Sequence, residues 1–227
     1  MRHSVYAFYV CRNQQQDGSS TGSLTDARLQ LNFDSTVMSM ASYSSHQSHD
    51  FTLADDLGSG SAIPLCIPND IEWDQQQKKC KRLKNVERTT LQLNPMALEI
   101  LRSITGPVCV ISIVGPCRSG KSYILSRLIS NTGAECHFDL GHEMDPKTLG
   151  IWMWDQPFKL KLKDSDEEVT IILLDTEGFD VAYATDRGDS QIFTLSVLLS
   201  SQLIYNSWSV PKRNDLSQMQ YPHYKCN

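Results

Sequence analysis

Residues 115–122 have the composition and spacing of a loop that binds phosphate groups. They run Gly-Pro-Cys-Arg-Ser-Gly-Lys-Ser and fit the pattern G-x-x-x-x-G-K-[ST]. In such a loop the glycines let successive backbone N–H groups point at phosphate oxygens, and the helix that follows adds the positive end of its dipole. A lysine placed like Lys121 contacts the β- and γ-phosphates, and a hydroxyl placed like that of Ser122 binds Mg²⁺. These residue types indicate phosphoryl chemistry.

The sequence on either side of the loop predicts the two elements that must position it. Residues 108–114 are apolar and mostly β-branched, which predicts a strand, and residues 123–129 have the pattern of a helix. Strand, glycine-rich loop and helix in this order distinguish a phosphate loop from a chance match in a surface loop.

A second group of candidate residues follows another predicted strand. Residues 169–174 form a continuous apolar run, which is typical of a strand covered on both faces in a parallel sheet. The run ends at Asp175-Thr-Glu177-Gly178, a D-x-x-G motif. We expect Asp175 to hold Mg²⁺ through water and the Gly178 N–H to sense the γ-phosphate. The motif is weak alone and strong behind such a strand and after a phosphate loop.

Composition narrows the class of protein. The 227-residue chain has a formal net charge of −5, which does not favour binding to nucleic acid through a basic face. Its seven cysteines have no regular spacing, so they predict neither a disulfide framework nor a zinc site. Cys109 and Cys117 fall in the predicted strand and loop, so we expect reduced thiols and a cytoplasmic protein. No apolar run approaches the ~20 residues of a membrane span.

The chain divides into three parts. Residues 1–60 are rich in Ser, Gln, Asp, Gly and Thr and are predicted to form a mostly disordered tail. Residues 61–206 are predicted to form the folded domain, and residues 207–227, without clear periodicity, an irregular tail. A basic run at 78–84 is open to two interpretations. The first is a patch that binds anionic lipid or directs nuclear import. The second, a solvated insertion with acidic neighbours, is favoured.

The remaining patterns predict an α/β protein with helices on both faces of its sheet. Strands are expected at 63–67, 151–154, 158–162 and 203–205, and helices after Asn94-Pro95 and over 190–199. The long loop at 131–150 is typical of a functional segment. No further strand is predicted after 203–205, so we expect that strand to have an unpaired edge.

Four segments together resemble the GTP-binding domain (G domain) of guanylate-binding proteins, which belong to the dynamin-related large GTPases. They are GPCRSGKSYILSRL, KTLGIWMW, LLDTEGF and SVLLSSQLIYNS, and the resemblance runs from about Pro64 to Ser207. The GIWMW and DTEG segments favour this branch over the atlastins. The resemblance implies a three-layer phosphate-loop NTPase fold, here incomplete in its C-terminal half, with GTP and Mg²⁺ as ligands.

The resemblance also implies roles for individual residues. Arg118 matches an internal arginine finger, Thr148 the Mg²⁺-binding threonine of the first switch, and Glu177 a glutamate tied to the water-activating network. The expected catalytic residues are Arg118, Lys121, Thr148 and Glu177, and the expected metal ligands are Ser122, Thr148 and Asp175. Nucleotide contacts are expected from Gly115, Arg118, Ser119, Gly120, Lys121, Ser122, Tyr123, Thr148, Asp175 and Gly178.

Three departures from the family pattern bear on function. Pro146 stands where the family has a serine that places the attacking water, and proline has neither a hydroxyl nor an N–H. The Arg213-Asn-Asp215 segment follows the last predicted strand too closely to be the family's base-reading Arg-Asp pair. Cys226 is next to last, so no prenylation box is expected.

Three functions therefore stay open at this stage. The first is a Mg²⁺-dependent GTPase that forms homodimers or heterodimers through its G-domain face. The second is a truncated, non-catalytic isoform that at most binds nucleotide or associates with full-length relatives. The third is a general phosphate-loop ATPase, because no segment of the sequence selects guanine.

Overall fold

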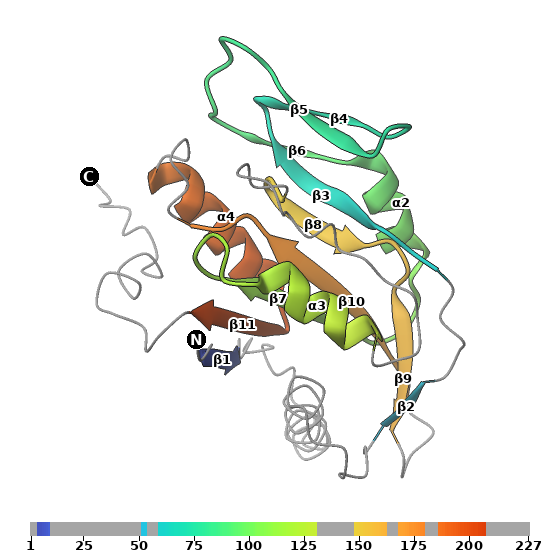
Figure 1. The fold of residues 1–227 in the computed structure, drawn as a ribbon. Helices are drawn as coiled ribbons and strands as arrows, with labels where there is room; N and C mark the ends of the chain where they lie inside the picture. The colour runs from blue at the N-terminus through green and yellow to red at the C-terminus, as the bar shows by residue number, and fades with distance from the viewer. Residues whose placement is uncertain are drawn as a thin grey trace, which may run out of the picture.

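The computed structural model of the chain describes residues 4–9, 51–53, 59–130, 148–162, 168–179 and 186–207. Its centre is a nine-stranded mixed sheet, in the order β1-β11-β7-β10-β8-β3-β6, with β9 beside β10 and β2 beside β9 (Figure 1). The strands of the main path are β1 (Ser4–Tyr9), β3 (Ala62–Pro68), β6 (Leu91–Leu93), β7 (Val108–Val114), β8 (Ile151–Trp154), β10 (Glu168–Thr176) and β11 (Gln202–Ser207). Within the described part, no helix is long and apolar enough to cross a membrane.

The central strands carry the two predicted motifs at one end of the sheet. β10 and β11 both pair with β7 in parallel, and the register places Asp175 opposite Ile113. The phosphate loop leaves β7 directly after Val114, so it begins close to Asp175, the next-to-last residue of β10. Parallel pairing thus joins motifs that lie far apart in the sequence, because the carboxyl ends of parallel strands meet at one edge.

Helices cover both faces of the sheet, which confirms the predicted α/β class. The helices are α2 (Pro95–Ser103), α3 (Lys121–Ser130) and α4 (Asp186–Leu199). Along β10, Ile171 and Leu173 pack in the cluster that contains residues of α3, while Ile172 and Leu174 pack with α2 and α4. This alternation follows from the two-residue period of a strand, which lets one continuous apolar run cover two faces.

The predicted start of α2 is also confirmed. Asn94 is the N-cap, and its side-chain oxygen accepts a hydrogen bond from the Met96 N–H at 3.2 Å. Pro95 occupies the first helical position, where a missing N–H costs nothing because that group has no intrahelical partner.

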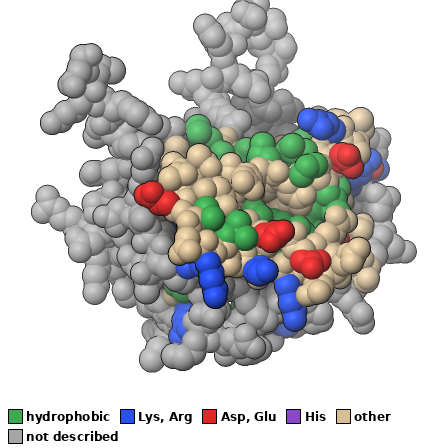
Figure 2. Space-filling view, turned by 90° about the horizontal axis from the view of Figure 1, so that it is seen from above, with side chains coloured by type: hydrophobic (Ala, Val, Ile, Leu, Met, Phe, Trp, Pro, Cys, Tyr) green, Lys and Arg blue, Asp and Glu red, His purple; other side chains and the backbone are tan. Residues whose placement is uncertain are grey.

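The basic run lies on a separate two-stranded hairpin of β4 (Ile71–Asp74) and β5 (Lys79–Arg82). The antiparallel register places Glu72 opposite Lys81 and Asp74 opposite Lys79. Figure 2 views the molecule from the side of this hairpin and shows acidic and basic side chains intermixed rather than one basic patch. The structure therefore favours the solvated insertion over a binding patch for anionic lipid.

The edge of β11 is not unpaired, so that expectation is wrong. β1 runs antiparallel along the whole of β11, from Ser4 opposite Ser207 to Tyr9 opposite Gln202. β2 (Phe51–Leu53) lies in the same N-terminal segment and pairs with β9 (Phe158–Leu162). The sequence analysis missed both strands because the segment around them is polar, and their partners are distant in the chain. Apart from these strands and residues 59–60, the predicted tail at 1–60 lies outside the described residues.

Interrupting β1 is expected to destabilise the domain. The paired substitution Tyr6→Pro and Ala7→Pro removes two successive N–H groups, and one of any two successive residues in this edge strand faces β11. A backbone group left without its partner costs ~1–3 kcal/mol. We therefore expect the thermal unfolding midpoint to fall by about 2–12 °C, since ~1 kcal/mol shifts it by about 2–4 °C in a chain of this size.

The matched control for β1 is the pair Tyr6→Val and Ala7→Thr, which keeps both N–H groups and favours extended backbone. Differential scanning calorimetry of both variants checks the prediction. Equal midpoints for the proline pair and the control would show that β1 contributes nothing to the stability of the sheet.

Candidate functional site

The phosphate loop requires glycine at its first position. Gly115 has φ +145°, and a Cβ placed there would lie 2.1 Å from the backbone oxygen of Asn206 on β11. The Asn206 side chain also holds the loop, because its Nδ2 donates to the Ser119 carbonyl oxygen at 2.6 Å. Asn206 is a residue that the motif search missed, since only the parallel pairing of β11 with β7 brings it to the loop.

The segment after β10 forms the other wall of the loop. The Cys117 N–H donates to the Phe179 carbonyl oxygen at 3.0 Å, and the Phe179 N–H donates to that of Gly115 at 3.2 Å. A Cβ at Gly178 would lie only 2.3 Å from the Cys117 Cα. The glycine of the D-x-x-G motif is therefore required by close contact with the phosphate loop, whatever its N–H binds.

Three predicted metal ligands meet at one point. Asp175 Oδ2 accepts hydrogen bonds from the Ser122 Oγ at 2.6 Å and from the Thr148 Oγ1 at 3.1 Å. Asp175 is buried, and burial raises its pKa, while Lys121 and the hydrogen bonds from Ser122, Thr148 and the Thr176 N–H oppose that rise. The structure thus collects two hydroxyls and one carboxylate from three separate segments of the chain.

This donor set fits Mg²⁺. Mg²⁺ prefers oxygen ligands and is held by one or two carboxylates together with substrate phosphates, rather than by a cage of protein groups. The described residues contain no group of three or more His, Cys, Asp or Glu side chains that could hold a metal by themselves. The arrangement around Asp175 is therefore suited to an ion that takes its other ligands from a phosphate and from water.

Lys121 lies inside the loop rather than on its surface. Its side chain is buried, and the Nζ donates to the carbonyl oxygens of Gly115 at 3.1 Å and Pro116 at 3.0 Å. Burial lowers the pKa of Lys121, and the charges of Asp175, Cys117 and Glu177 oppose this. The ammonium is thus held in the centre of the loop, where the motif predicts a phosphate.

The Glu177 carboxylate accepts hydrogen bonds from two separate segments of the chain, at Arg88 and at Gly150. The guanidinium of Arg88 donates to the two carboxylate oxygens of Glu177, NH1 to Oε1 at 2.9 Å and NH2 to Oε2 at 2.5 Å. The Gly150 N–H donates to Oε2 at 3.0 Å, and the Glu177 N–H donates to the Gly150 carbonyl at 2.8 Å. Arg88 is the second functional candidate that the sequence analysis missed.

The remaining predicted residues lie as follows. Arg118 is exposed at the top of the loop, with φ +61°, a left-handed conformation that is uncommon for a residue with a Cβ. Tyr123 lies on the first turn of α3 and is 52% exposed. Gly120 and Ser119 sit in the loop as expected, with Ser119 buried. Pro146 and Arg213 lie outside the described residues.

Four cysteines of the described part, Cys66, Cys80, Cys109 and Cys117, are free thiols. Burial raises the pKa of Cys66, Cys80 and Cys109 to about 11 in each case. Because the thiolate is the reactive form, these three thiols are expected to react slowly with thiol reagents at neutral pH.

Fold and site together define an α/β phosphate-loop protein in which the loop, Asp175 and Thr148 are assembled in one place. The family model described as guanylate-binding protein, N-terminal domain, matches residues 88–223, and the chain belongs to this family. The matched range continues past residue 207, into the segment that the sequence analysis separated as a divergent tail. It does not include β3, β4 or β5, which come before residue 88.

Three relatives illustrate the similarity. Human guanylate-binding protein 3 is 45% identical over 139 residues, covering 60% of this chain and 22% of the relative. Mouse guanylate-binding protein 7 is 44% identical over 136 residues, and human guanylate-binding protein 4 is 45% identical over 132 residues. These alignments cover 60% and 58% of this chain and 20% and 19% of those relatives. The chain thus spans about a fifth of the length of the relatives that it matches.

Proposed function

We propose that this chain binds GTP together with Mg²⁺ at the phosphate loop and hydrolyses the bond to the γ-phosphate. The observation that carries the proposal is the convergence of Ser122 and Thr148 on Asp175, beside the buried ammonium of Lys121. Guanine as the base is supported by the names of the relatives, which are guanylate-binding proteins.

Binding is assigned to the loop and to the strand end beside it. The Lys121 ammonium exchanges its contacts with the Gly115 and Pro116 carbonyls for oxygens of the β- and γ-phosphates. Backbone N–H groups at the N-terminus of α3 face the same phosphates. Mg²⁺, when bound, neutralises charge on the phosphates, and Ser122, Thr148 and Asp175 are the residues that would hold it.

In the proposed reaction a water molecule attacks the γ-phosphorus, and the bond from that phosphorus to the oxygen that bridges it to the β-phosphate breaks. Negative charge spreads over the transferred group and the leaving oxygen, and the Arg118 guanidinium offsets it. Glu177 takes part through hydrogen bonds that orient the water. Pro146 provides neither a hydroxyl nor an N–H for that water, so we expect hydrolysis to be slow.

The sequence feature at Pro146 also favours the second candidate function, which is nucleotide binding without appreciable turnover. In that case the chain acts by association with relatives, as a homodimer or heterodimer through the face that carries the nucleotide. We further propose the cytosol as its compartment, and the four free cysteines of the described part support this.

Equilibrium binding tests the proposal directly. Fluorescently labelled GTP and ATP are titrated with the purified chain, in Mg²⁺ and again in EDTA. We expect GTP to bind with micromolar or better affinity in Mg²⁺, and at least about tenfold more weakly in EDTA because the phosphate charge is then uncompensated. Equal affinities for GTP and ATP would contradict guanine as the preferred base. Failure of both nucleotides to bind would refute the site.

A further inference from the structure

The segment between β5 and β6 is fixed by one asparagine. Asn69 Oδ1 accepts hydrogen bonds from the N–H groups of Thr89 at 2.9 Å and Thr90 at 3.0 Å, and its Nδ2 donates to the Glu87 carbonyl at 3.0 Å. The Asn69 N–H adds a fourth bond, to the Thr90 carbonyl at 2.9 Å. These bonds lie on both sides of Arg88 in the sequence, so the backbone that carries Arg88 is held in place.

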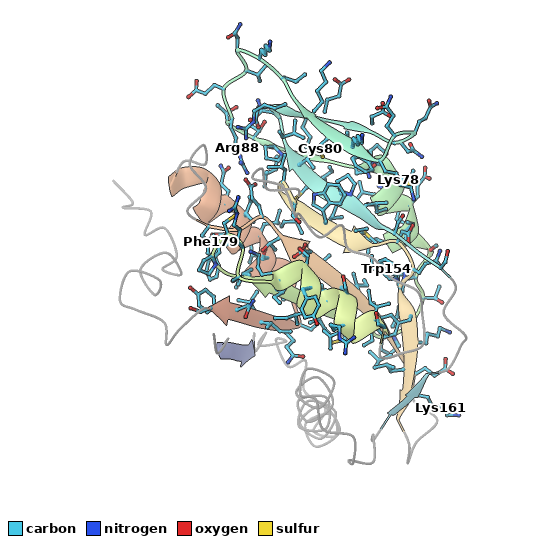
Figure 3. All side chains as sticks on the ribbon, viewed as in Figure 1. Lys78, Cys80, Arg88, Trp154, Lys161 and Phe179 are labelled. Carbon is cyan, nitrogen blue, oxygen red and sulfur yellow. The ribbon has the colours of Figure 1, made fainter. Side chains whose placement is uncertain are left out.

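Arg88 is turned inward from this segment. Glu87 and Thr89 on either side are exposed, whereas the Arg88 side chain is 8% exposed and Glu177, which it contacts, is 1% exposed. Figure 3 shows Arg88 at the end of the sheet where Phe179 and the phosphate loop lie. The two parallel N–H···O bonds form the bidentate geometry that a planar guanidinium allows and an ammonium does not.

Glu177 in turn connects two segments of the proposed nucleotide site. It lies between Asp175 and Gly178 of the D-x-x-G motif, and its Oε2 accepts from Gly150, two residues after Thr148. A change in the position of this carboxylate therefore bears on both segments. Among the described residues, Oε2 accepts two hydrogen bonds, from Arg88 and Gly150, and Oε1 accepts one, from Arg88.

We infer that Arg88 is a positioning residue for hydrolysis, which holds the Glu177 carboxylate in one orientation through two parallel hydrogen bonds. The Arg88 guanidinium binds both carboxylate oxygens of Glu177. Asn69 holds the backbone segment that carries Arg88. This role presupposes the nucleotide hydrolysis proposed above.

The alternative is that the ion pair only joins β4–β5 to the rest of the domain. A merely structural contact would affect unfolding and nucleotide affinity but would not separate the rate of hydrolysis from affinity. The test therefore measures three quantities on each variant of the full chain: the thermal midpoint, the Kd for a non-hydrolysable GTP analogue, and the single-turnover rate of GTP hydrolysis at saturating protein.

Arg88→Gln removes the charge and keeps much of the side-chain volume, and Arg88→Lys restores the charge without the bidentate geometry. Asn69→Ala frees the supporting segment and leaves Arg88 unchanged. Arg82→Gln is the matched control, because Arg82 is an arginine of the same insertion that pairs with Asp70 and is 39% exposed. Arg88→Gln and Arg82→Gln each remove one positive charge, so a difference between these two variants reports on where the charge lies and not on its loss.

We expect Arg88→Gln to lower the hydrolysis rate by about tenfold or more, with Kd changed by less than about threefold, because the water-orienting group is disturbed and the phosphate contacts are not. Asn69→Ala should lower the rate in the same direction, Arg88→Lys should recover part of it, and Arg82→Gln should match the unaltered chain. A rate unchanged in Arg88→Gln, or a rate that falls in parallel with the affinity for the analogue, would overturn the inference.

Three further outcomes are also decisive. If Arg88→Gln shows no cooperative unfolding, Arg88→Lys and Asn69→Ala decide the question, and rates equal to that of the unaltered chain in both would overturn the role of Arg88. If the unaltered chain binds the GTP analogue in Mg²⁺ but does not hydrolyse GTP, the inference fails while the binding site stands. If the unaltered chain does not bind the analogue, the proposed function itself fails.

Discussion

Replacing Lys121 with alanine is expected to weaken Mg²⁺-dependent GTP binding by at least about 100-fold, or ~2.7 kcal/mol. The Lys121 Nζ lies at the centre of the loop, where it now contacts the Gly115 and Pro116 carbonyls. A charge-assisted hydrogen bond to phosphate is among the strong ones, and its loss also leaves phosphate charge uncompensated. Titration with labelled GTP in Mg²⁺ measures the effect.

The same substitution should cost little stability, which separates loss of binding from loss of fold. Burial lowers the pKa of Lys121, so the native state disfavours its charged form relative to the unfolded chain. The free energy of unfolding is therefore highest above the usual lysine pKa, where Lys121 is neutral in both states, and it decreases as pH falls through the lowered pKa. At neutral pH the buried charge of Lys121 thus lowers the stability of the native state. We therefore expect Lys121→Ala to lower the thermal unfolding midpoint by at most a few degrees.

Lys159 provides the control, because it is an exposed lysine that pairs with Glu168 on the neighbouring strand. Lys159→Ala removes the same charge from the chain and should leave the GTP affinity within about twofold, since exposed ion pairs contribute little. Unchanged affinity in Lys121→Ala would exclude the phosphate loop as the nucleotide site. An equal loss in both variants would point to net charge rather than to the loop.

Replacing Arg118 is expected to have the largest effect on turnover. An arginine that stabilises charge on the transferred phosphoryl group contributes about 10³ or more to the rate, so the single-turnover rate should fall by that order. Asparagine is the substitution of choice, because Arg118 has φ +61° and Asn tolerates this left-handed conformation better than most residues with a Cβ. A change in rate then reports on the guanidinium and not on a distorted loop.

The prediction for Arg118 requires that binding be preserved. Kd for GTP should change by less than about threefold, since the exposed guanidinium is proposed to act on charge that develops only during the reaction. Pro146→Ser is the companion variant of opposite sign, because it restores a hydroxyl at the position that lacks one. Rates that respond to neither substitution would show that the roles implied by the family do not apply to this chain.

The sequence alone determined the local parts of the site. The phosphate loop, the D-x-x-G motif and the Asn94-Pro95 helix start were predictable because each depends on residues that are neighbours in the chain. A glycine is required where the backbone is crowded, a hydroxyl where a metal is bound, and a capping side chain where N–H groups have no partner. The apolar run of β10 likewise indicated a strand with two covered faces.

The tertiary structure decided which distant residues complete those parts. Arg88 meets Glu177 across 89 residues, and Asn206 meets Ser119 across 87. β1 reaches β11 from the other end of the chain and pairs the edge that the sequence analysis expected to be free. No local pattern identifies such partners, because strand pairing and buried ion pairs depend on backbone register and on which side chains the fold encloses together. The motifs therefore indicated the candidate site, and only the packing of the sheet showed which distant residues hold its parts in place.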